Sequence, residues 1–265
     1  LDFSNLDKVF IIGQEQARIE LQVEQIHGNY LLNFKLQTLT LVGLEADKYA
    51  LDINKGSITF QNVTANVKKG LGNFASTTVI SNDLTITSDD LTAHALNLVT
   101  ASRITSTNLK GYGAYKSLVF GDDTTEKFDM TNTESYGTCD TGLWFTSNST
   151  SDPTLAITGA TITNAGVGIF VSGVRNTAVE SLIARTLCFK CDRGLQIKDT
   201  TVNVYNVTLD DCVSGLVAEF DSTVYLKNAI ISNCTTGIVP DTNAVVNIDH
   251  VDFFQNLTNY PETYL

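Results

Sequence analysis

The sequence predicts an all-β chain folded as a right-handed parallel β-helix, a solenoid of about ten coils with roughly 21 to 27 residues in each. The first observation is a glycine followed by a branched aliphatic residue, which returns at intervals of 26, 26, 21 and 22 residues. The second is a small residue three positions before each glycine. The third is an alternation of apolar and polar residues between the glycines, which is typical of strands. The glycine pairs are Gly142-Leu143, Gly168-Ile169, Gly194-Leu195, Gly215-Leu216 and Gly237-Ile238.

The small residues before the glycines form one inward column if the coils stack in register. They are Cys139, Ala165, Cys191, Cys212 and Cys234. A disulfide between coils and a soft-metal site are alternatives, but parallel neighbours keep their Cβ atoms near the strand spacing of about 4.8 Å, wider than the roughly 3.8 Å that a disulfide prefers. We therefore expect a structural ladder of buried free thiols at Cys139, Cys191, Cys212 and Cys234, and no metal.

The alternating stretches predict two short strands in each coil, separated by a corner. Residues 202–207, 224–229 and 246–251 show this pattern, with aliphatic residues on one face and polar residues on the other. Asn206, Asn228 and His250 stand where the corner is expected. Asparagine tolerates left-handed backbone, so these residues are expected to turn the chain there.

The whole chain, residues 1–265, is predicted to be a single domain, because each coil of a solenoid packs only on its neighbours. Coil repeats are clear in residues 137–256 and less regular in residues 10–136. Helix is disfavoured because Val, Ile, Thr and Asn dominate without a sustained 3.6-residue period. A β-sandwich is the structural alternative, but it does not need glycine and cysteine to return in a fixed register.

From Gly142 to Asn256 clearly, and from about Ala17 onwards weakly, this coil pattern resembles the pectate-lyase-like right-handed β-helix superfamily, with repeats of the PbH1 type. The resemblance implies the fold more than the function, because lyases, hydrolases, phage spikes, adhesins and fibre proteins share the pattern. Pectinolytic members act on an outer face of the rod, with acidic residues and calcium or with paired carboxylates.

Charge and hydropathy exclude two classes of partner. The chain carries 17 basic and 29 acidic residues, a net charge of −12, which repels nucleic acid and anionic lipid. No apolar run is long enough to cross a membrane within this chain. The expected partners are glycans or other protein subunits, with a homo-oligomer or filament as a further expectation, since uncapped β edges invite pairing. The segment around Pro261 is a candidate cover for one end.

Three acidic residues are the candidates for catalysis. Alignment of the coils by their glycines places Glu219 and Asp241 side by side on adjacent coils, near the separation of a retaining glycosidase or of calcium ligands. Asp249 lies in an Ile-Asp-His segment that is similar to one in pectate lyases. The alternative is a solvated acidic edge with an ordinary corner at His250. No cofactor is expected, with calcium as the alternative.

Aromatic and asparagine residues give the remaining signals. Exposed aromatic rings are typical of glycan-binding surfaces, and inward packing is the alternative for each candidate. The candidates for such a platform are Trp144, Phe145, Phe170, Phe220 and Tyr225. Asn-x-Ser/Thr triplets are acceptors of N-linked glycans in a secretory pathway, or chance products of an Asn- and Thr-rich repeat. They begin at Asn62, Asn148, Asn206, Asn233 and Asn256.

Together these observations predict an extracellular or cell-surface β-helix module with a structural, adhesive or fibre-forming role, and glycan binding is one form that this role can take. The alternative function is a carbohydrate-active enzyme, a polysaccharide lyase or glycoside hydrolase, that acts on an outer face of the rod. The sequence contains no convincing set of an acid, a base and an arginine of the kind such an enzyme needs, which favours the non-enzymatic interpretation.

Overall fold

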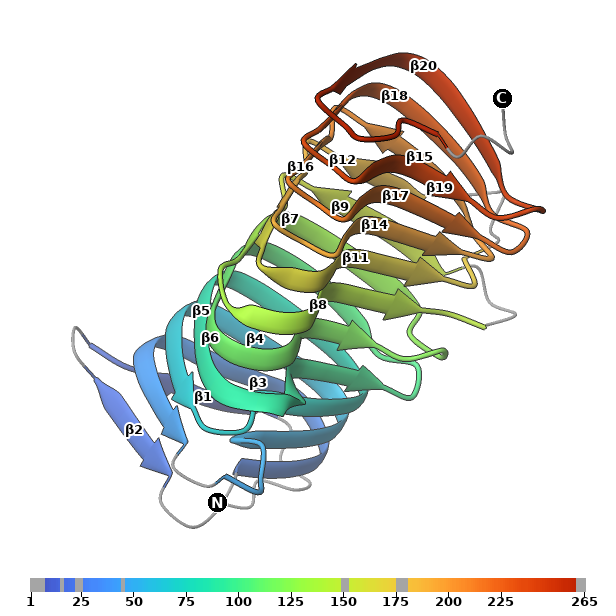
Figure 1. Ribbon diagram of the computed structural model, residues 1–265. Helices are drawn as coiled ribbons and strands as arrows, with labels where there is room; N and C mark the ends of the chain where they lie inside the picture. The colour runs from blue at the N-terminus through green and yellow to red at the C-terminus, as the bar shows by residue number, and fades with distance from the viewer. Residues whose placement is uncertain are drawn as a thin grey trace.

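The chain forms a parallel β-solenoid of about nine turns, as predicted, close to the expected ten coils. A computed structural model describes residues 8–14, 17–21, 26–43, 46–148, 153–174 and 181–260. The coils stack into a rod with β1 (Lys8–Ile12) and β2 (Arg18–Leu21) at one end and β20 (Val245–Phe254) at the other (Figure 1). The Pro261 segment lies outside the described residues. Within the described ranges, no helix has the length and apolar character to cross a membrane.

The strands differ in length along the rod. Long strands that bend around the coil come first: β3 (Ile26–Gly43), β4 (Leu51–Val67), β5 (Gly72–Val99) and β6 (Arg103–Gly121). Shorter strands follow: β7 (Lys127–Ser135), β8 (Thr138–Thr146), β9 (Thr154–Thr158), β10 (Thr161–Thr163), β11 (Ala165–Ser172), β12 (Leu182–Ala184), β13 (Leu187–Phe189), β14 (Arg193–Lys198), β15 (Thr201–Tyr205), β16 (Thr208–Asp210), β17 (Ser214–Glu219), β18 (Thr223–Ser232) and β19 (Thr236–Pro240).

Each coil presents three strand positions to the coil above and the coil below. The first is the position of β15, the second that of β16, and the third that of β17. Thr201 pairs with Thr223 and Thr223 pairs with Val245, so the chain rises by one coil every 22 residues at this end of the rod. Because all these pairs are parallel and in register, residues in equivalent positions stack in columns.

A single residue turns the chain between the first and second strand positions. Asn206, Asn228 and His250 have φ values of 54°, 52° and 55°, which confirms the predicted left-handed corners. The same corner lies at Asn108 and Asn132, where the Asn132 Nδ2 group donates a hydrogen bond of 3.2 Å to Asn108 Oδ1. The corner amides therefore satisfy one another across coils as well as tolerating the backbone.

The glycine repeat is explained by close approach of the backbones. A Cβ atom on Gly168 would lie 2.4 Å from the carbonyl oxygen of Gly194, and one on Gly194 would lie 2.7 Å from that of Gly215. A Cβ atom on Gly215 would lie 2.6 Å from the Gly237 oxygen. Only glycine leaves room for the carbonyl of the next coil, which is why this residue marks the register of the sequence.

Candidate functional site

The small residues of the repeat lie in the interior of the rod. Ala165 pairs with Cys139, and Cys191, Cys212 and Cys234 follow on successive coils. All five cysteines of the chain are buried and free. Burial raises the pKa of Cys139 to about 12, and a hydrogen bond with Cys191, followed by burial, raises that of Cys212 to about 12. The thiols of Cys139 and Cys212 are thus protonated and poorly nucleophilic at neutral pH.

Glu219 and Asp241 lie on consecutive coils, since Ala218 pairs with Pro240 just before them. Their carboxylates are held by different partners. The Gln196 Nε2 group donates to Glu219 Oε2 at 3.0 Å. Asp241 accepts the backbone N–H of Phe220 at 2.7 Å and that of Asn243 at 2.9 Å, and these bonds lower its pKa. Asp241 is therefore an anion that fixes a corner and is a poor proton donor at neutral pH.

Asp249 is likewise engaged on both oxygens. Its Oδ2 atom lies 2.8 Å from Lys227 Nζ on the preceding coil, and its Oδ1 atom contacts the ring of His250. The hydrogen bond from Lys227 is the main cause of the lowered pKa of Asp249. A general acid needs a carboxyl group whose pKa is raised, so Asp249 does not suit that role.

The potential glycosylation sites differ in how free their amides are. Asn62 and Asn206 are exposed at left-handed corners. Asn233 is also exposed, but its Nδ2 group donates to Asp210 at 2.7 Å. Asn256 donates to the carbonyl of Ile231 and accepts the backbone N–H of Cys234, so its amide is part of the fold. The second and third residues of the Asn148 triplet lie outside the described residues.

The aromatic platform candidates separate into three groups. Phe145 is completely buried, so the expectation of an exposed ring is wrong there. Phe220 and Tyr225 are exposed on other parts of the rod. Trp144 and Phe170 are partly exposed, pair with each other, and point outward from the third strand position because their neighbours Leu143, Phe145 and Ile169 point inward.

Trp144 and Phe170 belong to an outward column that we call the lateral strip. It runs along the third strand position over successive coils, with each member paired with or hydrogen-bonded to the next. The strip consists of His27, Asp52, Asn73, Asn97, Phe120, Trp144 and Phe170. Its first four members are polar and its last three are aromatic.

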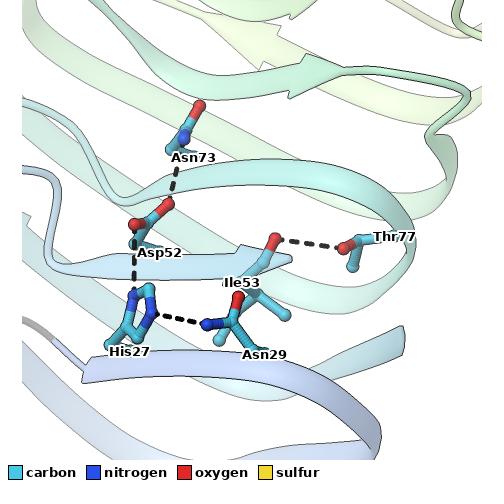
Figure 2. Close-up of polar contacts among 6 residues, drawn as sticks. All are labelled: His27, Asn29, Asp52, Ile53, Asn73 and Thr77. Atoms are coloured by element: carbon cyan, nitrogen blue, oxygen red, sulfur yellow. Dashed lines mark hydrogen bonds and ion pairs between the residues drawn. The ribbon is translucent and has the colours of Figure 1, made fainter. Parts of the chain in front are cut away.

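The polar part of the lateral strip is one chain of side-chain hydrogen bonds, and Figure 2 shows its section from His27 to Asn73. Asn97 Nδ2 donates to Asn73 Oδ1 at 2.8 Å, and Asn73 Nδ2 donates to Asp52 Oδ1 at 3.0 Å. The other carboxylate oxygen of Asp52 lies 3.2 Å from His27 Nδ1. Figure 2 also shows the hydroxyl of Thr77 bonded to the carbonyl of Ile53, which ties the adjacent corner to the preceding coil.

The chain of bonds assigns the tautomer of His27. An ionised Asp52 only accepts hydrogen bonds, so His27 Nδ1 carries the hydrogen. Asn29 Nδ2 lies 3.2 Å from His27 Nε2, which then accepts from the amide. The neutral Nδ1–H imidazole satisfies both contacts. Asp52 thus holds the His27 ring and the Asn73 amide in fixed orientations, and the side chains of His27 and Asp52 remain 38% and 31% exposed.

The aromatic part of the lateral strip is a rigid cluster. The ring centroids of Phe120 and Trp144 lie 5.4 Å apart, and those of Trp144 and Phe170 lie 5.5 Å apart. The interplanar angles of 75° and 73° are edge-to-face contacts, a favourable geometry for aromatic pairs. His94 stacks on Phe120 with centroids 4.2 Å apart. Lys116 Nζ lies 5.8 Å from the centroid of Trp144.

His94 packs against the aromatic part of the lateral strip. Its Nδ1 atom lies 2.6 Å from the hydroxyl of Ser117. Burial, followed by the positive charge of Lys116, lowers the pKa of His94 to about 4. Tyr49 is hydrogen-bonded to the backbone of His94, and burial raises the pKa of Tyr49. Both rings are therefore uncharged at neutral pH.

Sequence reasoning found Trp144 and Phe170 but missed the rest of the lateral strip. The signal is the residue that directly follows the buried aliphatic of the third strand: Trp144 follows Leu143, Asn97 follows Leu96 and Asp52 follows Leu51. The N-terminal coils lack the glycine that marks this position. In the part of the chain that the structure describes, no group of three or more His, Cys, Asp or Glu residues is close enough to hold a metal ion.

Comparisons with known proteins identify no family for this chain. The sequence matches no protein-family model and no curated protein. Among solved structures, the crystal structure of the periplasmic alginate epimerase AlgG is similar, with a TM-score of 0.48 and 8% identity over 96% of this chain and 85% of that chain. The fold assignment rests on the strand pairing of this chain, and the activity of that protein is not transferred to it.

Proposed function

We propose that the chain is an extracellular or cell-surface adhesive module that binds a glycan along the lateral strip. The observation that carries this proposal is the continuity of the strip, in which a hydrogen-bonded polar chain leads directly into an aromatic cluster. Sugars present both hydroxyl groups and apolar C–H faces, so a surface that recognises them combines amides or carboxylates with aromatic rings. Such ladders also stabilise neighbouring coils, which a binding experiment separates from recognition.

The geometry favours recognition because the side chains are ordered before any ligand binds. Asp52 fixes His27 and Asn73 through two hydrogen bonds, and Trp144 is fixed between Phe120 and Phe170. Side chains held in this way lose little conformational entropy when a ligand contacts them. The exposed corner asparagines Asn62 and Asn206 support a secretory location, where their triplets are acceptors of glycans.

The test uses the single tryptophan of the chain as a reporter, since Trp144 lies in the strip. Neutral and acidic soluble polysaccharides are titrated while Trp144 fluorescence and the heat of binding are followed. We expect saturable binding that Phe170→Ala and Asn97→Ala each weaken about tenfold, with no loss in Tyr136→Ala, which removes an exposed ring that is not a member of the strip. Binding that Tyr136→Ala abolishes and Phe170→Ala spares would overturn the assignment.

The same incubations test the enzymatic alternative. Unsaturated or reducing-end products are measured over time, with and without calcium. A binding module gives none. Product formation by the wild-type chain would replace the adhesive function with catalysis, and its loss in Glu219→Gln, Asp241→Asn or Asp249→Asn would show which of these carboxylates takes part.

A further inference from the structure

A hollow of about 210 Å³ lies on the first strand position near the C-terminal end of the rod. It is separate from the lateral strip, which occupies the third strand position. Two outward columns line the hollow over three consecutive coils. One column is Asn203, Tyr225 and Asn247, and the other is Tyr205, Lys227 and Asp249.

The walls of the hollow offer flat apolar surface and fixed hydrogen-bonding groups. Tyr225 is 45% exposed, and Tyr205 borders the hollow from the preceding coil. The Tyr205 hydroxyl donates to Asn203 Oδ1 at 2.8 Å, which fixes the Asn203 amide and leaves its Nδ2 group as the donor for a ligand. Two amides and two phenol rings within one hollow combine the groups that sugars require.

The charge in the hollow is balanced. Lys227 Nζ and Asp249 Oδ2 form an ion pair at 2.8 Å, so the one cation and the one anion of the lining neutralise each other. An anionic sugar gains no net attraction from this pair and is repelled by a chain of net charge −12. A neutral sugar does not depend on net charge for its affinity, and it can form charge-assisted hydrogen bonds with both Lys227 and Asp249.

The size of the hollow limits its occupant. Pockets for drug-sized ligands occupy roughly 300–1,000 Å³, so a smaller hollow suits a smaller ligand. We propose that the hollow is a second binding subsite that takes one neutral sugar ring, stacked on Tyr225 and hydrogen-bonded to Asn203 and Asn247. This subsite lies on a different face from the glycan site proposed above and does not depend on it.

Saturation-transfer NMR with simple methyl glycosides tests the subsite. The probes are methyl glucoside, methyl galactoside and methyl mannoside, with methyl glucuronide as the charged counterpart. We expect at least one neutral glycoside to bind, with an affinity that Tyr225→Ala lowers about tenfold and Asn203→Ala lowers less. Tyr112→Ala, which removes an exposed ring elsewhere, and Phe170→Ala, which disrupts the lateral strip, are expected to leave this binding unchanged.

Trp144 fluorescence distinguishes this subsite from the lateral strip. A sugar in the hollow leaves the fluorescence unchanged, because Trp144 is on another face of the rod. Far-UV circular dichroism confirms that Tyr225→Ala is folded. The proposal fails if no neutral glycoside binds, if methyl glucuronide binds more tightly than the neutral probes, or if folded Tyr225→Ala binds as wild type.

Discussion

Different kinds of side chain fill the interior of the rod in its N-terminal and C-terminal sections. In the N-terminal section, residues 8–148, completely buried rings fill the interior, among them Phe34, Phe60, Phe74, Tyr115 and Phe128. In the C-terminal section, residues 153–260, no aromatic ring is completely buried among the described residues; aliphatic side chains, thiols and a few hydroxyls such as that of Ser222 fill the interior, and glycine backbones approach closely. The comparison shows that one fold accepts interiors filled by large rings or by smaller side chains, and the repeat is visible in the sequence where close-contact glycines return on successive coils.

Removal of a buried ring is expected to have the largest effect. Phe128 is completely buried and lies 5.1 Å from the ring of Phe145, so Phe128→Ala is expected to lower the free energy of unfolding by about 3–5 kcal/mol. Val224 lies in the same inward column in the C-terminal section, and Val224→Ala is expected to lower the free energy of unfolding by about 2 kcal/mol. Chemical denaturation measures both. Equal losses would contradict the contrast between the two cores.

Cys139 and Cys212 are expected to react slowly with a disulfide reagent for different reasons. With a pKa of about 12, Cys139 and Cys212 should react with a disulfide reagent at pH 8 about a thousandfold more slowly than the same thiols in the unfolded chain. Cys191→Ala removes the hydrogen bond that raises the pKa of Cys212, so Cys212 should react faster while Cys139 does not. Mass spectrometry of the labelled peptides gives each rate. Equal acceleration of both thiols would indicate general loosening instead.

The pKa of about 4 predicts that His94 makes stability depend on pH. This value lies below the ordinary 6.5, so the unfolded chain binds more protons between these two pH values. The His94 contribution to stability is therefore complete above pH 6.5 and declines as the pH falls towards 4, by roughly 3 kcal/mol. His94→Gln should flatten this part of the stability profile, measured by thermal unfolding at each pH. An unchanged slope would show that His94 is solvated.

The effect of a small addition at glycine is expected to depend on what the new Cβ atom meets. A Cβ atom on Gly168 would meet the backbone oxygen of Gly194, so Gly168→Ala should cost about 1–3 kcal/mol. A Cβ atom on Gly111 would instead meet side-chain atoms of Leu118 and Tyr115, at 2.5 and 2.8 Å. Leu118→Ala should therefore partly rescue Gly111→Ala. A double-mutant cycle without coupling between these two changes would contradict this account.

The sequence predicted the fold well because backbone contact leaves a periodic mark. Gly168, Gly194 and Gly215 are required by the carbonyl of the next coil, and Asn206 and Asn228 are favoured by left-handed corners. In the N-terminal section Leu118 follows Ser117 at the position where Gly142 follows Thr141, so the register is hidden there. Ring packing has no fixed spacing, and such a core is recognised only once the coils are stacked.

The candidate site was predicted only in part, for a related reason. Asp52 and Asn73 are separated by 21 residues and belong to coils whose register the sequence does not mark, so their hydrogen bond could not be foreseen. Glu219 and Asp241 were correctly placed on adjacent coils. Their hydrogen bonds with Gln196 and with the backbone of Phe220 were not predictable, because the outward direction of a side chain does not reveal which group it will meet.

The lateral strip relates the number of coils to the length of ligand that the rod can contact. Each coil contributes one side chain to the strip, so the strip is divided into steps of about 4.8 Å along the rod axis. Insertion of a whole coil between Asn97 and Phe120 would leave every side chain of the strip pointing outward. It would move the polar part away from the aromatic part by one strand spacing. The length of ligand that the surface contacts thus depends on the number of coils. Gain or loss of complete coils changes this length and leaves the individual contacts unchanged.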